Sequence, residues 1–369
     1  MLSKPYDYGK NWLNTCDFMV DTEKIVKSMH TFAAILPHIK LMHVCGTHEQ
    51  SIVQYGLRSL FPENVEVIAG PGCPVCITPK YDIDSAVFLA KEGMTVTTFG
   101  DMYRVPSTES LSDAKSKGAD IRVVYSISNA LEIAQKNPHK EVVHFGIGFE
   151  TTAPTTALVV REAPENFSVL CCHRLIPPAL LFLLGLGEID IQGFIEPGHV
   201  STIIGTRPYE VISEQYQLPQ VVAGFEAEDL LMAILMLLKQ LKEQRHEVEN
   251  QYTRVVKEGG NVLAQKAMGE AFDVVDADWR ALPKIAQSGY EISEKYEECN
   301  ARKRFEDVLE KFDFLPDEPK GCRCGEVLRG LVYPEACPLF RKACTPLNPV
   351  GPCMVSREGS CSIQYRYGK

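Results

Sequence analysis

Thirteen cysteines in a chain of 369 residues are the first feature that points to chemistry. Two of them, Cys73 and Cys76, form a Cys-x-x-Cys pair in residues 70–76 (GPGCPVC), a loop stiffened by prolines. Such a dithiol can close a disulfide or hold one side of a metal ion. We expect a redox-active dithiol first, metal ligation second and a purely structural pair third.

A second cysteine loop precedes this pair, at residues 45–49 (CGTHE). Cys45 would lie just before a helix, where the helix dipole and the free amides stabilise a thiolate. His48 can face the same side of the first turn and exchange a proton with Cys45, and Thr47 can cap the helix. The alternative is that Cys45 is a small buried apolar residue and His48 an ordinary loop histidine. The glycine and the threonine between them favour the functional interpretation.

Two further loops each offer one titratable side chain. Residues 146–152 (GIGFETT) contain Gly-x-Gly but lack the third glycine of a dinucleotide-binding loop, so a capped helix start is the simpler interpretation. Glu150 would supply a carboxylate there. Residues 197–201 (PGHVS) hold His199, which can act as an acid, a base or the partner of a thiolate or metal. Most lone histidines have no such role.

The strongest chemical signal is the C-terminal tail, which holds six cysteines: Cys322, Cys324, Cys337, Cys344, Cys353 and Cys361. Their spacing is irregular, whereas zinc ribbons use paired Cys-x-x-Cys knuckles. An iron–sulfur cluster held by four thiolates fits this pattern better than zinc. Six cysteines leave two over, which can form a dithiol beside the cluster, and the spacing does not say which four are ligands. Elsewhere, Cys171 and Cys172 lie in an apolar segment, and at least one should pack in the core.

The rest of the sequence predicts the elements that must position these loops. Apolar segments alternate with amphipathic ones, which indicates βαβ units and a largely parallel sheet. The expected strands are residues 39–44, 65–69, 95–99, 121–125, 141–147, 167–172, 193–196 and 220–223. The expected helices are residues 21–34, 47–60, 81–91, 110–117, 128–136, 151–160 and 226–241. Residues 245–315 are charged and are also expected to be helical.

Loops that leave the carboxyl ends of parallel strands line one cleft, and all four chemical loops follow expected strands. We therefore predict an α/β fold in which two parallel-sheet domains face a cleft, with a small Cys-rich iron–sulfur domain at the C-terminus. The first α/β domain would span residues 1–120 and carry the 45–49 and 70–76 loops. The second would span 121–300 with a helical extension, with exchange of chain between the two allowed, and residues 301–369 would form the cluster domain.

Composition narrows the class of protein. A formal charge of −10 argues against nucleic-acid binding, which needs a basic surface. The longest apolar run, residues 230–238, is too short to span a bilayer, and residues 1–6 lack the apolar segment of a signal peptide. We expect a cytoplasmic protein without membrane contact, where thiols stay reduced and many cysteines indicate metal or redox chemistry instead of a disulfide framework.

Together these motifs resemble the HypD family of [NiFe]-hydrogenase maturation factors. The resemblance rests on CGTHE, GPGCPVC, GFETT, PGHVS and the tail's CMVSREGSC, in the family's order from about residue 24 to the end. It implies a three-domain protein with one [4Fe-4S] cluster, an assembly factor more than a conventional turnover enzyme. With a small partner, HypC, such a protein builds the Fe(CN)₂CO unit of the hydrogenase active site.

The resemblance also implies roles for the cleft cysteines. Cys45 would hold the iron of the Fe(CN)₂CO unit together with a cysteine of HypC, and Cys73 and Cys76 would relay electrons between the cluster and that iron. Cyanide would come from a second partner, HypE, which receives its precursor from HypF.

Three further residues would line the same cleft: His48, Glu150 and His199. Two functions of other classes stay open on the residues alone. A free-standing iron–sulfur disulfide reductase could dispense with Cys45, and a zinc-stabilised interaction module would have no redox function.

Overall fold

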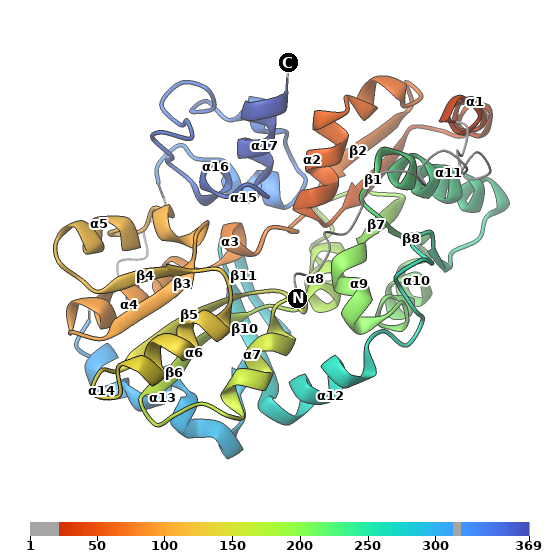
Figure 1. Cartoon of the computed structure of the whole chain (residues 1–369). Coiled ribbons are helices and arrows are strands. Elements are labelled where there is room, and N and C mark those ends of the chain that lie inside the picture. The colour runs from red at the N-terminus through yellow and green to blue at the C-terminus, as the bar shows by residue number, and fades with distance from the viewer. Residues whose placement is uncertain (1–21, 313–318, 369) are drawn as a thin grey trace, which may run out of the picture.

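The computed structural model describes residues 22–312 and 319–368. Asp21, the first residue of the first expected helix, and residues 1–6 lie outside the described residues. Two parallel β-sheets form the centre of the molecule, and in the view of Figure 1 the Cys-rich tail lies above one of them, which contains β3 to β6, and beside the other, which contains β1 and β2. The predicted α/β class with two parallel sheets and a Cys-rich C-terminal region is confirmed.

The first sheet has five parallel strands in the order β2-β1-β7-β8-β9. They are β1 (Ile39–His43), β2 (Val65–Ala69), β7 (Gly193–Pro197), β8 (Gln220–Ala223) and β9 (Val248–Asn250). Helices α1 (Thr22–Ala33) and α11 (Ala227–Glu243) pack on one face through an apolar cluster that includes Leu41 and Ile195. Helices α8 (Ile176–Leu186) and α10 (Glu210–Tyr216) pack on the opposite face, where Phe194 points.

The second sheet has four parallel strands in the order β4-β3-β5-β6. They are β3 (Thr95–Phe99), β4 (Ile121–Val124), β5 (Val142–Gly148) and β6 (Phe167–His173). Helices α4 (Lys80–Lys91) and α5 (Leu111–Ser116) cover one face. Helices α6 (Ile127–Lys136), α7 (Ala153–Val160) and α12 (Val262–Ala271) cover the other. Strands β5 and β6 are buried along their whole length, as expected of strands covered on both faces, although they also bury His144, Ser168 and His173.

The chain crosses between the sheets twice. It enters the first sheet through β1 and β2, forms the second sheet with β3 to β6, and returns through β7. A unit ending at residue 120 would separate β3 from β4, which pair from Val96↔Ile121 onward, so that expected boundary does not follow the sheets. Sheet membership depends on long-range pairs such as Leu41↔Gly193, which local periodicity does not encode.

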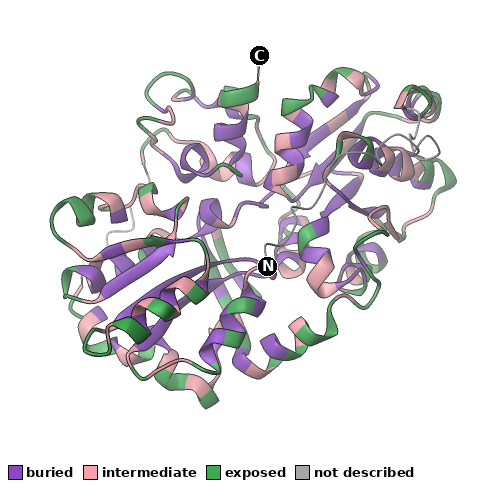
Figure 2. Cartoon of the chain, viewed as in Figure 1, coloured by how far each residue is buried: buried purple, intermediate pink, exposed green. Residues whose placement is uncertain are grey.

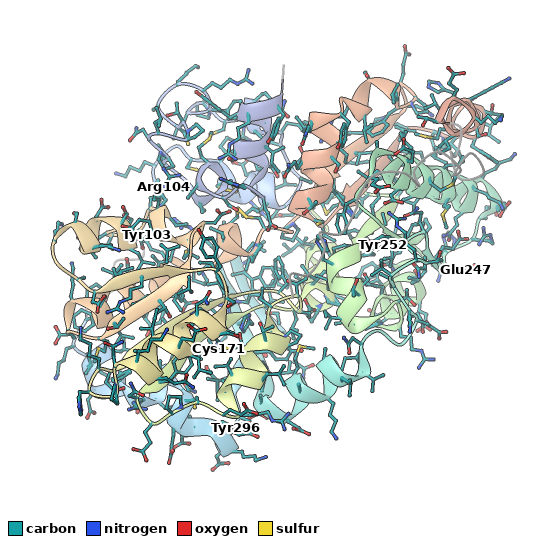
Figure 3. The ribbon with its side chains drawn as sticks, viewed as in Figure 1. Tyr103, Arg104, Cys171, Glu247, Tyr252 and Tyr296 are labelled. Atoms are coloured by element: carbon teal, nitrogen blue, oxygen red, sulfur yellow. A yellow bond between two sulfur atoms is a disulfide. The ribbon has the colours of Figure 1, made fainter. Side chains whose placement is uncertain are left out.

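Most expected elements are confirmed to within two residues at each end. The exception is the helix expected at residues 47–60, which is two elements, α2 (Gly46–Gln54) and the 3₁₀ turn η1 (Leu57–Leu60). Gly56 lies between them with φ +65°, the left-handed conformation that ends helices. The expected packing of Cys171 and Cys172 in the core is also confirmed, since both are buried in β6; Cys171 is labelled in Figure 3.

The expectation that residues 245–315 are helical is wrong in part. Besides β9 and α12, they contain an antiparallel hairpin of β10 (Phe272–Trp279) and β11 (Leu282–Ile292), followed by η4 (Glu294–Cys299), α13 (Ala301–Arg304) and α14 (Glu306–Leu309). Register shifts on either side of Ala277 break the period-two pattern by which strands are recognised in a sequence. The hairpin packs against β6, where Arg174 pairs with Gly289.

Short helices complete the structure. They are η2 (Met102–Arg104), α3 (Pro74–Ile77), α9 (Gly198–Ile204) and η3 (Arg207–Tyr209) between the sheets' strands, and α15 (Cys324–Leu328), η5 (Pro334–Ala336), α16 (Pro352–Val355) and α17 (Ser360–Tyr367) in the tail. The tail rests on α2 and α3. Figure 2 shows most strands of the two parallel sheets buried and the outer faces of the helices exposed. No helix within residues 22–312 and 319–368 is long and apolar enough to cross a membrane.

Candidate functional site

A cavity of about 1020 Å³ lies where the two sheets and the tail meet. All four chemical loops line it, as the strand-end rule predicts. Their contributions are Cys45 after β1; Gly72, Pro74 and Val75 after β2; Gly148, Phe149, Thr151 and Thr152 at and after the end of β5; and Pro197, His199 and Val200 at and after the end of β7. Arg104 and Tyr252 also line the cavity and lie on its two sides in Figure 3.

Cys45 occupies the N-cap of α2, so Thr47 is not the cap. Its sulfur is half-buried, and the residue lines the cavity. The backbone amides of His48 and Thr47 donate toward the sulfur, but burial outweighs them and raises the pKa of the thiol to about 11. Burial therefore opposes the expected thiolate, because the desolvation cost exceeds the helix-terminus effect, and the thiolate stays a prediction. Any metal that binds this sulfur must displace a proton.

His48 faces away from Cys45. Its Nε2 donates to the carbonyl of Ala223 at 3.3 Å, and its ring lies 5.2 Å from that of Phe225. Burial is the main cause that lowers the pKa of His48 to about 3, so the ring is neutral. Only the backbone amide of His48 reaches the sulfur, so the expected proton exchange between the two side chains is not what the geometry supports.

His199 does reach the cavity, where it is exposed. Its ring stacks on Phe225 with centroids 3.8 Å apart and planes 23° from parallel. Phe225 therefore separates the rings of His48 and His199. Phe225 was not among the expected site residues. The strand-end rule could have indicated this residue, because Phe225 follows the carboxyl end of β8.

Cys73 and Cys76 are joined as a disulfide at α3. Cys73 caps this short helix, and its sulfur accepts a hydrogen bond from the amide of Cys76 at 3.2 Å. Both residues are buried, directly behind Pro74 and Val75 in the cavity wall.

Gly72 fixes this pair relative to Cys45. A Cβ at Gly72 would lie 2.2 Å from the carbonyl carbon of Val44 and 2.4 Å from the amide nitrogen of Cys45. The amide of Gly70 donates to the carbonyl of His43 at 2.8 Å. The Cys-x-x-Cys loop thus packs backbone against backbone on the Cys45 loop, which only glycine permits.

Glu150 lies behind the cavity wall, although Phe149 and Thr151 on either side line the cavity. Its Oε1 accepts a hydrogen bond from the amide of Ile176 at 3.0 Å, at the start of α8. The side chain is 1% exposed, and burial raises its pKa to about 7. The expected carboxylate in the cleft is therefore a carboxyl group at a buried helix start.

The tail supplies part of the cavity that the sequence reading did not foresee. Arg357 and Glu358 line it. Asp101, which follows β3, accepts hydrogen bonds from Ser356 Oγ at 3.2 Å and from the amide of Arg357 at 3.0 Å. Glu358 packs closely against Gly46: a Cβ added at Gly46 would lie 2.4 Å from the Cβ of Glu358. Arg357 and Glu358 belong to the CMVSREGSC motif between Cys353 and Cys361, which carried the resemblance but gave no place in the cleft.

The six tail cysteines face one small enclosed space, together with Phe340 and Met354. Cys324 and Cys353 are joined as a disulfide. The other four are free: Cys322, Cys337, Cys344 and Cys361. Burial is the main cause that raises the pKa of Cys322 and of Cys361. The neighbouring tail cysteines raise both pKa values further, as expected for sulfurs that lie close together.

A second pocket, of about 210 Å³, connects the tail to the Cys-x-x-Cys loop. Cys76 from α3 and both Cys322 and Cys324 from the tail line it. One member of each disulfide therefore faces the same space.

Comparisons with known proteins identify the family to which the chain is similar. The family model described as "HypD: Hydrogenase formation hypA family" matches residues 21–368. A hydrogenase maturation factor HypD of Cupriavidus necator is 46% identical over 342 residues, which cover 89% of each chain. A HypD of Escherichia coli is 44% identical over 336 residues, again 89% of each chain. A HypD2 of Bradyrhizobium diazoefficiens is 45% identical over 344 residues, covering 89% of this chain and 90% of the relative.

Proposed function

The chain belongs to the HypD family of hydrogenase maturation factors, and from this premise we propose that it is a redox-active scaffold for metal-centre assembly. On it, with a HypC-type partner, the Fe(CN)₂CO unit of a [NiFe]-hydrogenase would be built. One observation carries the proposal: Cys45 faces the large cavity while the Cys73–Cys76 pair lies directly behind the same wall.

Cys45 is the residue to hold the iron. Among the described residues that line the large cavity, it is the one cysteine. A thiolate is the soft donor that suits a low-spin iron carrying cyanide and carbon monoxide. Because the pKa of the free thiol is raised to about 11, iron binding and loss of the proton occur together. A cysteine from the HypC-type partner would supply a second sulfur.

The Cys73–Cys76 pair is the relay to that iron. A dithiol that closes to a disulfide releases two electrons and two protons. The Cys324–Cys353 pair, which shares the 210 Å³ pocket with Cys76, is the natural source of those electrons. Oxidation of the tail pair to its disulfide would be balanced by reduction of Cys73–Cys76 to the dithiol.

The four free tail cysteines, Cys322, Cys337, Cys344 and Cys361, are the residues to hold a [4Fe-4S] cluster. They provide only thiolate donors in an enclosed, apolar surrounding, which is the donor set of such a cluster. When bound, the cluster supplies an electron store beside the tail pair.

The cavity fits the remaining partners of the family. Its volume of about 1020 Å³ is at the upper end for small-molecule sites, enough to admit a partner's chain end beside Cys45. A HypE-type protein would deliver cyanide there, after charging by a HypF-type carbamoyltransferase.

Infrared spectroscopy of the anaerobically purified complex with the HypC-type partner tests this function. We expect bands from metal-bound cyanide and carbon monoxide in the wild type and in Cys299→Ala, a control at a half-buried thiol outside both cysteine sites. The bands should vanish in Cys45→Ala. The second candidate, a free-standing disulfide reductase, is favoured by the closed Cys73–Cys76 pair; it predicts no bands in any variant and full reductase activity in Cys45→Ala.

A further inference from the structure

Three arginines that line the large cavity have no side-chain partner among the described residues. They are Arg104 in η2, Arg357 between α16 and α17, and Arg366 in the last turn of α17, and together they form the arginine rim. All three are exposed, and in the part of the chain that the structure describes their side chains make no ion pair, hydrogen bond or ring contact. Every other arginine is bound to a group of the chain, a carboxylate in most cases and a backbone carbonyl for Arg280 and Arg341.

The rim is positive, although the chain carries a formal charge of −10. Two acidic residues, Asp101 and Glu358, share the cavity lining with the three arginines. Asp101 is already engaged by Ser356 Oγ and by the amide of Arg357. An unpaired guanidinium matches a carboxylate in a bidentate pair. A locally positive rim on an acidic protein therefore attracts carboxylates to the cavity.

Apolar groups beside the rim indicate that the occupant is a protein segment. Tyr125 is 96% exposed and Val255 is 43% exposed, and both line the same cavity. Arginine and tyrosine are residue types enriched at the energetic centres of protein interfaces. The rim arginines come from separate segments, and the cavity of about 1020 Å³ exceeds what a small anion fills. A protein segment with several carboxylates can meet the arginines one by one and cover Tyr125.

Contacts between the tail and the sheets hold the rim together. Asp101 precedes Arg104 by three residues and accepts a hydrogen bond from the amide of Arg357 at 3.0 Å. Helix α17, which carries Arg366, packs against α2, and the N-cap of α2 is Cys45. The rim is therefore tied both to the end of β3 and to the helix that positions the cavity sulfur.

We propose that the arginine rim, with Tyr125 beside it, docks a carboxylate-rich segment of a partner protein and directs it into the cavity toward Cys45. This docking role rests on the proposed function, because it states how a partner is recognised where the iron is held. Charge attraction raises the rate at which the partner arrives, and burial of Tyr125 slows its departure. Because the tail supplies two of the three arginines, docking requires a folded tail.

Binding of a model peptide tests the rim without any partner protein. A rhodamine-labelled tetraglutamate peptide and its tetraglutamine counterpart are titrated with the full-length, cluster-loaded chain, and fluorescence anisotropy measures binding at low and at high salt. We expect tetraglutamate to bind about tenfold more tightly than tetraglutamine at low salt. The difference should shrink at high salt, because salt screens exposed charges.

Variants at the rim locate the binding site. Arg104→Gln, Arg357→Gln and Arg366→Gln should each weaken tetraglutamate binding by about threefold, the effect of one exposed charge pair, and the triple variant by more than about tenfold. Urea denaturation should be unchanged, because no ion pair or hydrogen bond of the described structure is lost. Arg161→Gln, at an ion pair with Glu270 at the end of α7, is the control and should leave binding unchanged. Equal affinity for the two peptides, or unchanged binding by the triple variant, would overturn the proposal.

Inorganic phosphate distinguishes a partner segment from a free anion. Phosphate competes with the labelled tetraglutamate peptide on the wild-type chain, and we expect displacement only at concentrations far above the Kd of the peptide, since phosphate meets fewer of the separate arginines. Displacement at equal concentration would assign the rim to a free anion and would overturn the docking role.

Association kinetics extend the test to the partners of the proposed function. Surface plasmon resonance with the HypC-type and HypE-type proteins should show, for at least one of them, an association rate about tenfold lower with the triple rim variant. Tyr125→Ala should mainly raise the dissociation rate. If neither partner responds to the triple variant, the docking role is wrong even where the wild type shows the infrared bands. A rim response without infrared bands would instead overturn the scaffold function and leave the rim assigned.

Discussion

The cleft loops (45–49, 70–76, 146–152 and 197–201) and the tail (319–368) both present cysteines, but they are held in place by different means. The cleft loops leave strands whose parallel register is continuous, as in the five paired residues from Ile39↔Val65 to His43↔Ala69. The tail has turns, helices of three to eight residues and one disulfide. Backbone pairing thus positions the cleft sulfurs, whereas the tail's packing gathers around its own sulfurs. We expect the cleft to keep its shape when a sulfur is removed and the tail to lose it.

The largest effect should follow removal of a tail sulfur. Cys337→Ala should abolish the binding of about four irons per chain and leave residues 319–368 open to proteolysis, because ligand binding and folding are coupled in small metal domains. Iron analysis and limited proteolysis followed by mass spectrometry measure both. Cys299→Ala serves as the matched control, and a Cys337→Ala chain that keeps its iron and its resistant tail would break the comparison.

Removal of the cleft sulfur should abolish function while sparing structure. Cys45→Ala should yield no mature hydrogenase in a strain lacking the chromosomal gene, with a change in unfolding free energy of less than about 1 kcal/mol, since a half-buried thiol contributes little packing. Maturation is assayed by hydrogenase activity and stability by urea denaturation. Maturation by this variant would contradict the role of Cys45, and a large loss of stability would contradict the claim that strands alone position the loop.

Glycine replacements compare the two regions at equal steric cost. Gly72→Ala would place a Cβ 2.2 Å from Val44, and Gly359→Ala would place one 2.3 Å from the carbonyl oxygen of Cys353. The first should lower the unfolding free energy by about 3 kcal/mol, because overpacking in the cleft strains both sheet loops. The second should mainly reduce iron content.

Gly259→Ala is the control for both, since nothing lies within 4 Å of its Cβ position. Urea denaturation of the three variants measures the change in unfolding free energy, and iron analysis measures the change in iron content. An equal loss of global stability from Gly72→Ala and Gly359→Ala would mean that the tail and the cleft unfold as one unit.

The smallest effect concerns pH and the buried carboxyl of Glu150. Burial raises its pKa in the folded chain to about 7 from an ordinary 4.5, so its protonated form is favoured by folding. The stability that protonated Glu150 contributes is fully present below pH 4.5 and is lost as the pH rises through 7. Raising the pH from 5 to 8 should therefore lower the unfolding free energy of the wild type by about 2 kcal/mol through the ionisation of Glu150.

Glu150→Gln should remove that part of the pH dependence, as measured by urea denaturation at both values. Glu132→Gln, at an exposed helix ion pair with Lys136, should change nothing. A pH profile unaffected by Glu150→Gln would show that the carboxyl is not buried as described.

The sequence was sufficient for the elements and for the convergence of the cleft loops. Strands β1 to β8 are parallel and, apart from the partly exposed β4, largely buried, so their apolar runs were visible without the structure, and loops at strand ends follow from that topology. The orientation of two site side chains was not predicted. The His48 side chain turns toward β8, and the Glu150 side chain turns toward the start of α8. A one-residue difference in a helix's first turn rotates a side chain by about 100°, and the sequence does not specify which partner it then meets.

The sequence by itself determined that this chain is a cysteine-rich α/β protein, and its five motifs resemble the HypD family. Residue types and local periodicity are sufficient for the α/β class, because they act within a few positions of the chain. Only the tertiary structure decided which strands share a sheet, which tail cysteines pair, and that Asp101 and Glu358 bring the tail onto Cys45. The contact between Asp101 and Arg357 alone joins residues 256 positions apart, and burial overrides intrinsic tendency at Cys45, where desolvation outweighs the helix terminus.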